Sequence, residues 1–171
     1  APGAALAVSV GGRRLYHTAG QLGVDVETPV SLETVYDLAS LTKVVALTTV
    51  AMMAVDEGRL ALDVPVSTYL PEWARPGKDR ATIRHLLTHS SGLPAHRPLW
   101  REANSPDSAK ALVLATALDT VPGARMVYSD LGAITLTIAL ERIYGQPIDR
   151  LFADRVATPL GLTSTRFQPP A

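Results

Sequence analysis

A long apolar stretch in the first third of the chain constrains the fold more than any other feature. From residue 41 to about residue 57 apolar side chains recur on nearly every side of a helix, and Gly58 follows where a helix would end. A helix that is apolar all round is buried inside a folded protein. Its most apolar part, residues 44 to 54, is too short to cross a bilayer, which needs about 20 residues. We therefore predict a buried central helix.

The composition is that of a globular protein with a small-molecule partner. The 171 residues are 47% hydrophobic and 19% charged, which provides enough apolar material for a packed core. Sixteen basic and sixteen acidic residues balance, so no charge excess favours nucleic acid or an anionic membrane. The chain has no cysteine, which excludes disulfides and thiolate chemistry. We expect no nucleic-acid partner and no transmembrane segment.

The remaining pattern predicts one β-hairpin followed by a helical region. Residues 3–10 and 13–19 can pair, and Gly11-Gly12 between them can adopt the positive φ angles of a tight turn. Ser105 is a candidate helix N-cap and Gly145 a candidate C-cap. The helix signals together predict helices at residues 82–87, 106–118, 131–144 and 147–156. The middle of the chain should therefore be rich in helix.

The sequence predicts too few strands for a stable sheet. Besides the hairpin, only residues 163–168 offer a further strand, and they run directly into Pro169-Pro170. A two-stranded hairpin alone is marginally stable in water. We therefore predict an α+β fold in which an N-terminal hairpin of an incomplete antiparallel sheet packs with helices, beside a mainly α-helical region. Residues 1–60 would hold the hairpin and the central helix, residues 61–171 the helical region, and residues outside this chain the rest of the sheet.

A possible nucleophile and base stand at the start of the central helix. Ser40-Leu41-Thr42-Lys43 places a hydroxyl and an amine three residues apart, on one helical face. A serine hydroxyl needs a base to remove its proton, and burial would lower the pKa of Lys43 toward that role. The free N–H groups of the helix N-terminus would favour a developing oxyanion. The structural alternative makes Ser40 an N-cap and Lys43 a solvated lysine.

The surroundings of this pair resemble a known enzyme family. The sequence YDLASLTK, residues 36–43, is similar to the nucleophile segment of serine β-lactamases and penicillin-binding proteins. The sequence TIRHLLTHSSGLP, residues 82–94, resembles the branch that contains class C β-lactamases, DD-peptidases and family VIII-type esterases. This resemblance runs through essentially the whole chain. It implies a β-lactamase/transpeptidase-like fold, acyl-enzyme chemistry on Ser40 with Lys43 as base, and no cofactor.

The resemblance also implies a second motif. Enzymes of this branch carry Tyr-x-Asn, whose phenol joins the serine and lysine in proton transfer, and Tyr128-Ser129-Asp130 stands where it would fall. Tyr128 is thereby implied as a proton shuttle, the alternative being a buried tyrosine packed before a helix. Asp130 is implied as a substrate-binding residue, yet a carboxylate cannot donate a hydrogen bond to an amide carbonyl as Asn does. Ester cleavage is therefore favoured over cleavage of β-lactam or peptide amides.

The third motif of the family is absent from this chain. That motif, Lys-Thr-Gly or His-x-Gly on a sheet strand, lines the pocket and supplies the second oxyanion N–H. Lys43, Lys78 and Lys110 are followed by Val, Asp and Ala, and none of His17, His85, His89 and His96 has Gly two residues on. We therefore expect the N-terminal part of such an enzyme, weak or inactive alone, with the C-terminal segment of the same protein as its partner.

The histidines do not indicate a metal site. His85 and His89 are four residues apart, but the segment lacks the glutamate of H-E-x-x-H and no third ligand is evident. We expect no metal and interpret both as histidines that satisfy loop carbonyls near the pocket. His96, Arg97 and Trp100 follow in the next loop, where they could border the pocket mouth or form a packed rim.

The leading hypothesis is a serine hydrolase that acts on a small acyl substrate, an ester or an amide, through Ser40, Lys43 and Tyr128. One alternative is a DD-peptidase or true β-lactamase of the same family. Another is a non-catalytic relative or fragment that only binds, or is acylated once. The resemblance favours the cell envelope or secretion over the cytoplasm.

Overall fold

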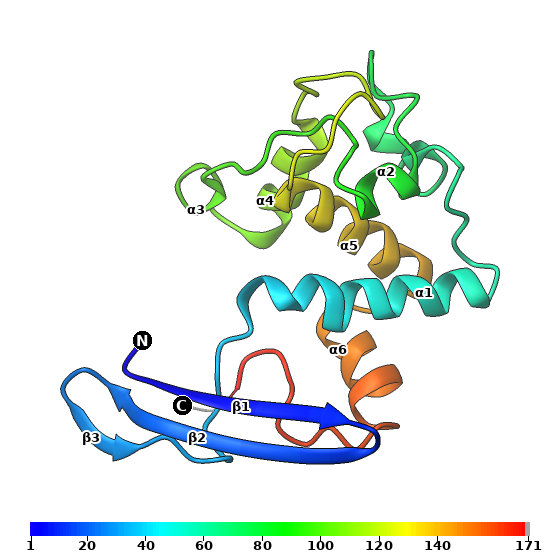
Figure 1. Cartoon of the computed structure of the whole chain (residues 1–171). Coiled ribbons are helices and arrows are strands. Elements are labelled where there is room, and N and C mark those ends of the chain that lie inside the picture. The colour runs from blue at the N-terminus through cyan, green and yellow to red at the C-terminus, as the bar shows by residue number, and fades with distance from the viewer. Residues whose placement is uncertain (170–171) are drawn as a thin grey trace. The chain divides into compact units, whose positions relative to one another are not determined.

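The computed structural model describes residues 1–169 (Figure 1). The packing of the chain divides it into two units, Ala1–Leu38 and Ala39–Ala171. By this division the central helix groups with the helical region. The division after residue 60, which assumes a completed sheet, stays a prediction.

The first unit is a three-stranded antiparallel sheet in the order β1-β2-β3. The strands are β1 (Gly3–Val10), β2 (Arg13–Gly23) and β3 (Val26–Pro29). The Gly11-Gly12 turn, with φ angles of 55° and 78°, joins β1 to β2, so the predicted hairpin is confirmed. The short β3 was not predicted from the sequence. Within the described residues β1 and β3 each pair along one side only.

Apolar side chains of the sheet lie exposed. They include Leu6, Val8, Val10, Leu15 and Tyr16, which are 39% to 71% exposed. Unpaired strand edges with exposed apolar side chains are an aggregation hazard unless something covers them. The unpaired edges and exposed apolar side chains agree with the prediction that further strands complete this sheet.

The central helix runs without interruption over Ala39–Asp56. It begins with a 3-10 turn, Ala39–Leu41, continues as a π-helical stretch, Lys43–Thr48, and ends as α1, Thr49–Asp56. By length and composition alone it could cross a membrane, but the core helix of a soluble protein passes the same test. Gly58, with a φ of 67°, follows its end as predicted.

Only one face of this helix is buried, which corrects the expectation of burial all round. Val50 and Ala54 lie in the core, whereas Val44 and Met52 are 56% and 66% exposed. The buried face packs on helices of its own unit, including α5 (Asp130–Tyr144). An apolar groove of about 560 Å³ runs along the helix beside Met52, with Leu62 and Leu87 also in its lining.

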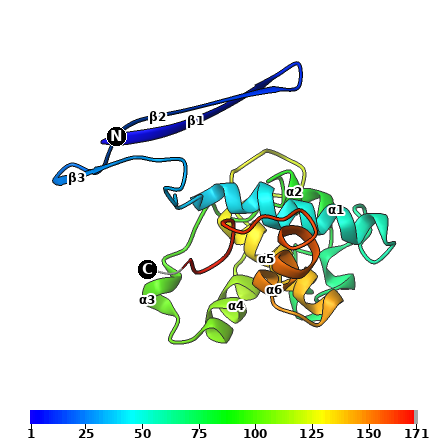
Figure 2. The ribbon, with the colours of Figure 1, turned by 90° about the horizontal axis from the view of Figure 1, so that it is seen from below.

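The second unit packs its other α-helices on α5 or, in the case of α3, on α4 (Figures 1 and 2). They are α2 (Ile83–Leu87), α3 (Leu99–Glu102), α4 (Pro106–Ala115) and α6 (Ile148–Phe152), which a π-helical turn, Ala153–Ala157, extends. Short 3-10 turns occupy Val66–Thr68 and Pro71–Trp73. The core includes Val50, Trp73, Ile83, Leu86, Leu136 and Leu140. Burial of such side chains stabilises a fold by about 25 cal/mol per Å² of apolar surface.

Helix ends follow the local signals. Ser105 accepts a hydrogen bond from the Ser108 N–H at 3.1 Å and so caps α4, as predicted. Gly145 closes α5 in the left-handed conformation, with a φ of 67°. The fourth helix nevertheless ends at Ala115, three residues before the predicted end at 118. Apolar residues continue past the end of this helix, which explains the overestimate.

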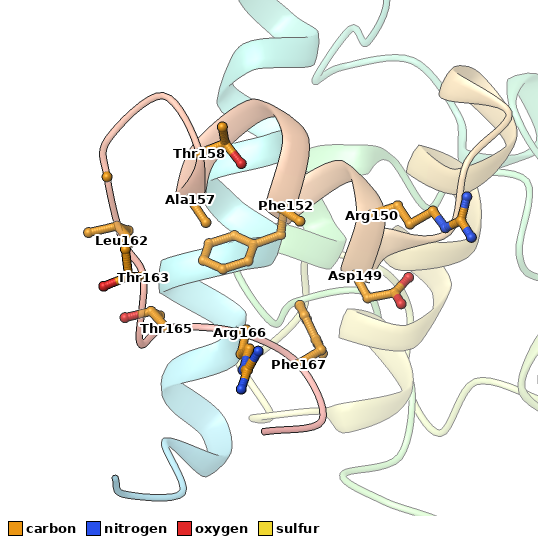
Figure 3. A pocket seen from close by; sticks show the side chains of 12 residues that line it. Asp149, Arg150, Phe152, Ala157, Thr158, Leu162, Thr163, Thr165, Arg166 and Phe167 are labelled. Carbon is orange, nitrogen blue, oxygen red and sulfur yellow. The ribbon is translucent and has the colours of Figure 1, made fainter. Parts of the chain in front are cut away.

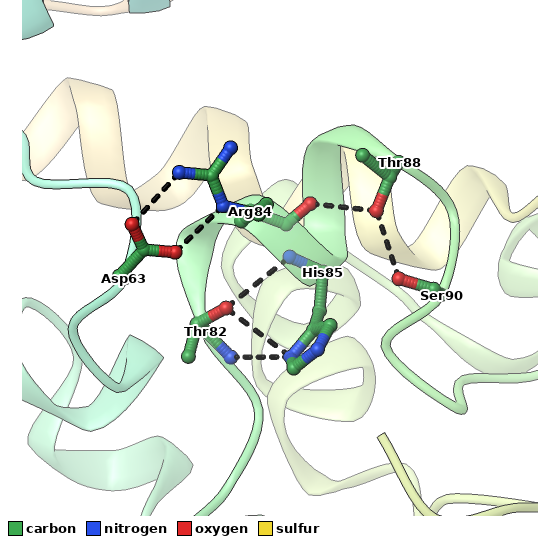
Figure 4. Close-up of polar contacts among 6 residues, drawn as sticks. All are labelled: Asp63, Thr82, Arg84, His85, Thr88 and Ser90. Atoms are coloured by element: carbon green, nitrogen blue, oxygen red, sulfur yellow. Dashed lines mark hydrogen bonds and ion pairs between the residues drawn. The ribbon is translucent and has the colours of Figure 1, made fainter. Parts of the chain in front are cut away.

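Polar contacts fix both ends of α2 and the loop after it (Figure 4). Arg84 donates two hydrogen bonds to the Asp63 carboxylate, at 2.6 and 2.7 Å. Thr88 donates to the Arg84 carbonyl at 2.8 Å and shares a hydrogen bond of 2.8 Å with Ser90. The chain therefore leaves α2 in a defined direction, toward His89.

The loop continues through a glycine that no other residue can replace without strain. Gly92 has a φ of 84°, and a Cβ atom there would collide with the carbonyl oxygen of Thr120. Its own carbonyl accepts a hydrogen bond of 2.8 Å from the Asp119 N–H. Both the conformation and the close approach of two backbones therefore require glycine.

The strand expected at residues 163–168 is wrong. The segment is irregular, and Phe167 packs edge-on against Phe152 with ring centroids 6.0 Å apart. Packing of this ring on the helical unit draws the segment out of the extended conformation, and Gln168 has a φ of 49°. Pro170, the second residue of the proline pair, lies outside the described residues.

Lys78 is a buried cation that the sequence pattern did not reveal. It is 2% exposed, its Nζ donates to the carbonyl of Leu114 at 2.8 Å, and it lies 3.8 Å from the centroid of the Trp73 ring. Neither partner carries a charge. Burial, aided by repulsion from Arg75, lowers the pKa of Lys78 to about 8.

Lys78→Met should change how stability depends on pH. A lysine with a depressed pKa binds fewer protons when folded, so the free energy of unfolding of the wild type rises between about pH 8 and about pH 10.5. The methionine variant lacks this contribution. The difference in unfolding free energy between the two proteins should change by about 3 kcal/mol across that window. Urea titrations at several pH values measure it, and parallel curves would contradict the burial of a charge.

Candidate active site

Ser40 and Lys43 meet at the start of the central helix. Lys43 Nζ donates a hydrogen bond to Ser40 Oγ at 3.0 Å. The spacing of three residues on one helical turn produces this contact, as the sequence predicts. The Lys43 side chain is 19% exposed, so the pair lies near the surface of the helical unit.

Tyr128 approaches the same pair from the segment before α5. Lys43 Nζ lies 4.9 Å from the centroid of the Tyr128 ring. Hydrogen bonding with Ser40, and then with Lys43, lowers the pKa of the Tyr128 phenol. The side chain is 51% exposed, so it is not the buried packing residue of the alternative interpretation. The structure thus brings together the three residues that the resemblance implies.

Asp130 forms an ion pair with Lys43 that the sequence did not predict. Its Oδ1 lies 2.7 Å from Lys43 Nζ. Asp130 is the first residue of α5, where a carboxylate also interacts favourably with the helix N-terminus. The carboxylate expected to face the substrate is therefore engaged with the lysine.

The charge state of Lys43 differs from the expectation. Burial lowers its pKa, but the hydrogen bonds and negative charge of Asp130, together with Tyr128, raise it more, so that the pKa of Lys43 lies above its ordinary value. The expected lowering of the Lys43 pKa rested on burial alone. Lys43 is therefore an ammonium ion at neutral pH when the site is empty of substrate.

Changing Asp130 to asparagine should lower the pKa of Lys43, because it removes the negative charge that raises it. Burial then remains as the main influence, so the pKa of Lys43 should fall relative to the wild type. The chain has three lysines, which makes their ¹³Cε signals easy to assign in an NMR titration. Asp25→Asn, in the exposed turn between β2 and β3, is a matched control. An unchanged Lys43 titration in Asp130→Asn would show that the ion pair does not set the charge.

His89 lies at the site, near the pocket as expected, but its Nδ1 accepts from a backbone N–H and does not serve a loop carbonyl. Its ring lies beside the Tyr128 ring, with centroids 4.5 Å apart, and its Nδ1 accepts a hydrogen bond from the Ser129 N–H at 3.1 Å. Burial, and then the nearby Lys43 charge, lower the pKa of His89. The sequence offered one signal, the position of His89 in the segment that resembles the enzyme family.

The two spaced histidines do not converge on a common point. His85 Nδ1 takes part in the capping box of α2, where it accepts from the Thr82 N–H at 3.2 Å. His89 Nδ1 is used by Ser129. Over residues 1–169 the structure contains no group of three or more histidine or carboxylate side chains that could hold a metal ion.

The loop after Pro94 is braced by its own contacts. Arg97 pairs with Glu102 at 2.5 Å and donates to Thr116 Oγ1 at 3.1 Å. Trp100 is 74% exposed. Arg97 therefore has a structural role in this loop, whereas the Trp100 ring lies largely in solvent and is not part of a packed rim.

A separate pocket lies near the end of the described chain (Figure 3). It has a volume of about 500 Å³ and is lined by α6, the turn after it and the segment that returns with Phe167. None of the residues implied in catalysis lines it. This pocket is therefore separate from the group formed by Ser40, Lys43 and Tyr128.

Comparison with known proteins identifies the family. A family model described as Beta-lactamase matches residues 1–171, and the chain therefore belongs to the β-lactamase family of serine hydrolases. It is 31% identical over 179 residues to D-alanyl-D-alanine-carboxypeptidase/endopeptidase AmpH of Escherichia coli (strain K12), a match that covers 99% of this chain and 46% of that protein.

Solved structures share the fold. The class C β-lactamase from Rhodobacter sphaeroides is 29% identical, with a TM-score of 0.84 over 99% of this chain and 47% of that chain. EstCE1, described as a hydrolase with promiscuous acyltransferase activity, is 29% identical, with a TM-score of 0.77 over 92% of this chain and 46% of that chain. The α+β, β-lactamase/transpeptidase-like fold is confirmed. The chain spans less than half the length of each of these three relatives.

Proposed function

We propose that this chain carries the nucleophile of a serine hydrolase that forms an acyl-enzyme on Ser40. The observation that supports it is the contact of three groups, in which Lys43 Nζ donates to Ser40 Oγ at 3.0 Å and Tyr128 interacts with both. In acylation, Ser40 Oγ bonds to the substrate carbonyl carbon while its proton leaves, and the alcohol or amine of the substrate departs with a proton. Water then reverses the sequence and releases the acid.

The proton of Ser40 passes to the pair formed by Lys43 and Tyr128. An ammonium ion beside a phenolate and an amine beside a phenol contain the same number of protons, so the pair acts as one base. The raised pKa of Lys43 and the lowered pKa of Tyr128 favour the first arrangement. In that arrangement the Tyr128 phenolate accepts the proton of Ser40 and returns it to the leaving group, and the positive charge of Lys43 favours the ionised form of the phenol.

Esters are the substrate class that Asp130 favours. An asparagine could donate a hydrogen bond to an amide carbonyl of the substrate, whereas a carboxylate paired with Lys43 cannot. The likeness to EstCE1, described as a hydrolase with promiscuous acyltransferase activity, supports acyl-transfer chemistry without naming a substrate. The likeness to AmpH and to a class C β-lactamase supports the second candidate, cleavage of D-alanyl peptides or β-lactams.

A downstream segment of the same protein completes the catalyst in this proposal. The chain covers under half of each relative named above, and the third family motif, with its second oxyanion N–H, is absent from it. Loss of one oxyanion donor typically lowers the rate by about 100-fold to 1000-fold. Residues 1–171 alone should therefore be acylated slowly and turn over poorly.

The test uses an activated nitrophenyl acyl ester. Phenolate release and the mass of the intact protein are followed for residues 1–171, with and without the downstream segment, and peptide mapping locates the adduct. We expect slow, single acylation on Ser40 by the chain alone and multiple turnover once the segment is added. Full turnover by residues 1–171 would contradict the need for the segment. Single acylation that stays single with the segment would establish the non-catalytic alternative.

A further inference from the structure

His89 contacts the segment that carries Tyr128 at three successive residues. Its carbonyl accepts from the Val127 N–H at 2.8 Å, its ring lies 4.5 Å from the Tyr128 ring at an interplanar angle of 36°, and its Nδ1 accepts from the Ser129 N–H at 3.1 Å. The two hydrogen bonds hold the backbone on either side of Tyr128. The ring contact limits where the phenol can point.

The backbone of His89 is strained in a way that makes these contacts possible. Its φ angle is 55°, a left-handed conformation that few residues other than glycine adopt. Such a conformation persists only where surrounding structure enforces it, and it is common at functional sites. Here it follows directly on the end of α2, and it turns both the carbonyl and the ring of His89 toward residues 127–129.

We infer that His89 is a positioning residue for Tyr128, which it holds against Ser40 and Lys43. This inference rests on the proposed function, because it gives Tyr128 a part in proton transfer. Two further hydrogen bonds also hold this segment, since Ser129 Oγ donates to the Pro94 carbonyl at 2.6 Å and the Asp130 N–H donates to the Ala95 carbonyl at 2.8 Å. Removal of the His89 side chain should therefore loosen Tyr128 without unfolding α5.

The hydrogen bond defines the charge of the imidazole. Nδ1 can accept from the Ser129 N–H only when it carries no proton, which assigns the neutral ring with its hydrogen on Nε2. Burial, and then the nearby charge of Lys43, disfavour a positive charge on the ring, and Asp130 opposes them more weakly. A neutral ring can lie beside Tyr128 without competing with Lys43 for the phenol.

Three variants separate the parts of this role. His89→Gly relieves the backbone strain but removes both ring and acceptor. His89→Asn tolerates the left-handed conformation and keeps an acceptor near the position of Nδ1, without the ring. His89→Phe keeps the ring without the acceptor. His17→Asn, on exposed strand β2, is the control.

The first readout is the ionisation of Tyr128, measured by near-ultraviolet absorbance and isolated by subtracting the same titration of Tyr128→Phe. In His89→Gly the phenol should lose its ordered contact with Ser40 and Lys43, so its pKa should rise toward the ordinary value of 10.0. His89→Asn should lie between that variant and the wild type. This measurement requires no catalysis.

The second readout is the rate of Ser40 acylation by the nitrophenyl ester. His89→Gly should reduce it by about 10-fold to 100-fold, the loss expected from a small misplacement of a reacting group, and His89→Asn should recover part of it. A folded His89→Gly with wild-type tyrosine titration and wild-type acylation would overturn the inference. If Tyr128→Phe itself acylates at the wild-type rate, the shuttle role in the proposed function fails instead.

Discussion

Replacing Ser40 with alanine in the protein completed by its downstream segment will abolish acyl-enzyme formation. No other group takes the place of a nucleophile that forms the covalent bond, and removal of a catalytic serine typically lowers kcat by roughly a millionfold. The measurement is the initial rate of phenolate release, together with the mass of the intact protein after exposure to the ester. Ser9→Ala, on exposed strand β1, controls for nonspecific acylation.

The fold should tolerate this change, because Ser40 Oγ is an acceptor at the surface and not a buried contact. The melting temperature of Ser40→Ala should therefore remain close to that of the wild type. If Ser40→Ala and the wild type are labelled alike, Ser40 is not the nucleophile. Ser129 would not be the next candidate, since it is buried and its hydroxyl is bound to the Pro94 carbonyl and the Gly132 N–H.

Replacing Lys43 with methionine should lower the acylation rate by about 100-fold to 10,000-fold, the usual contribution of a general base. Methionine keeps an unbranched side chain but can neither carry a charge nor exchange a proton. It also leaves Asp130 without its partner at 2.7 Å and Tyr128 without the nearby cation. The pKa of Tyr128 should then rise, because Lys43 is one of the groups that lower it.

Lys43→Arg separates the effect of the positive charge from the effect of proton exchange. Arginine keeps the positive charge beside Asp130 and Tyr128 but does not give up its proton in a protein. In the arrangement of an ammonium ion beside a phenolate, Lys43 contributes its charge, so Lys43→Arg should restore the Tyr128 titration and much of the acylation rate. Lys110→Met, which removes an ion pair with Glu141 elsewhere in the unit, controls for the loss of a lysine. A wild-type acylation rate in Lys43→Arg would show that Lys43 acts only through its charge.

The parts of the fold that could be predicted are those fixed by local chemistry. The Gly11-Gly12 turn, the Ser105 cap and the Gly145 terminus each act within a few residues, and the structure has all three as expected. Residues 163–168 have an extended pattern too, but a distant ring, Phe152, decides where Phe167 packs. Lys78 likewise lies beneath Trp73 and the end of α4 for reasons of tertiary packing.

The contacts in the site also separate into those fixed by local sequence and those fixed by distant packing. Ser40 and Lys43 are three residues apart on one helix, so their contact follows from helical geometry. Tyr128 could be placed only through the family resemblance, because nothing local connects residue 128 to residue 40. The ion pair between Lys43 and Asp130 joins residues 87 positions apart and depends on how α5 packs, so the charge state of the lysine could not be foreseen.

Gly92 limits which substitutions the loop after α2 can accept. Any side chain there would strike the Thr120 carbonyl, and the φ of 84° excludes most residues even if that carbonyl moved. Gly145 also has a positive φ, of 67°, but a Cβ atom there meets nothing within 4 Å, so asparagine or aspartate could replace it at modest loss. In a saturation library selected for folding, position 92 should therefore return glycine alone, while position 145 accepts a small set. Gly92, three residues after His89, would then stay constant while the sequence around it varies.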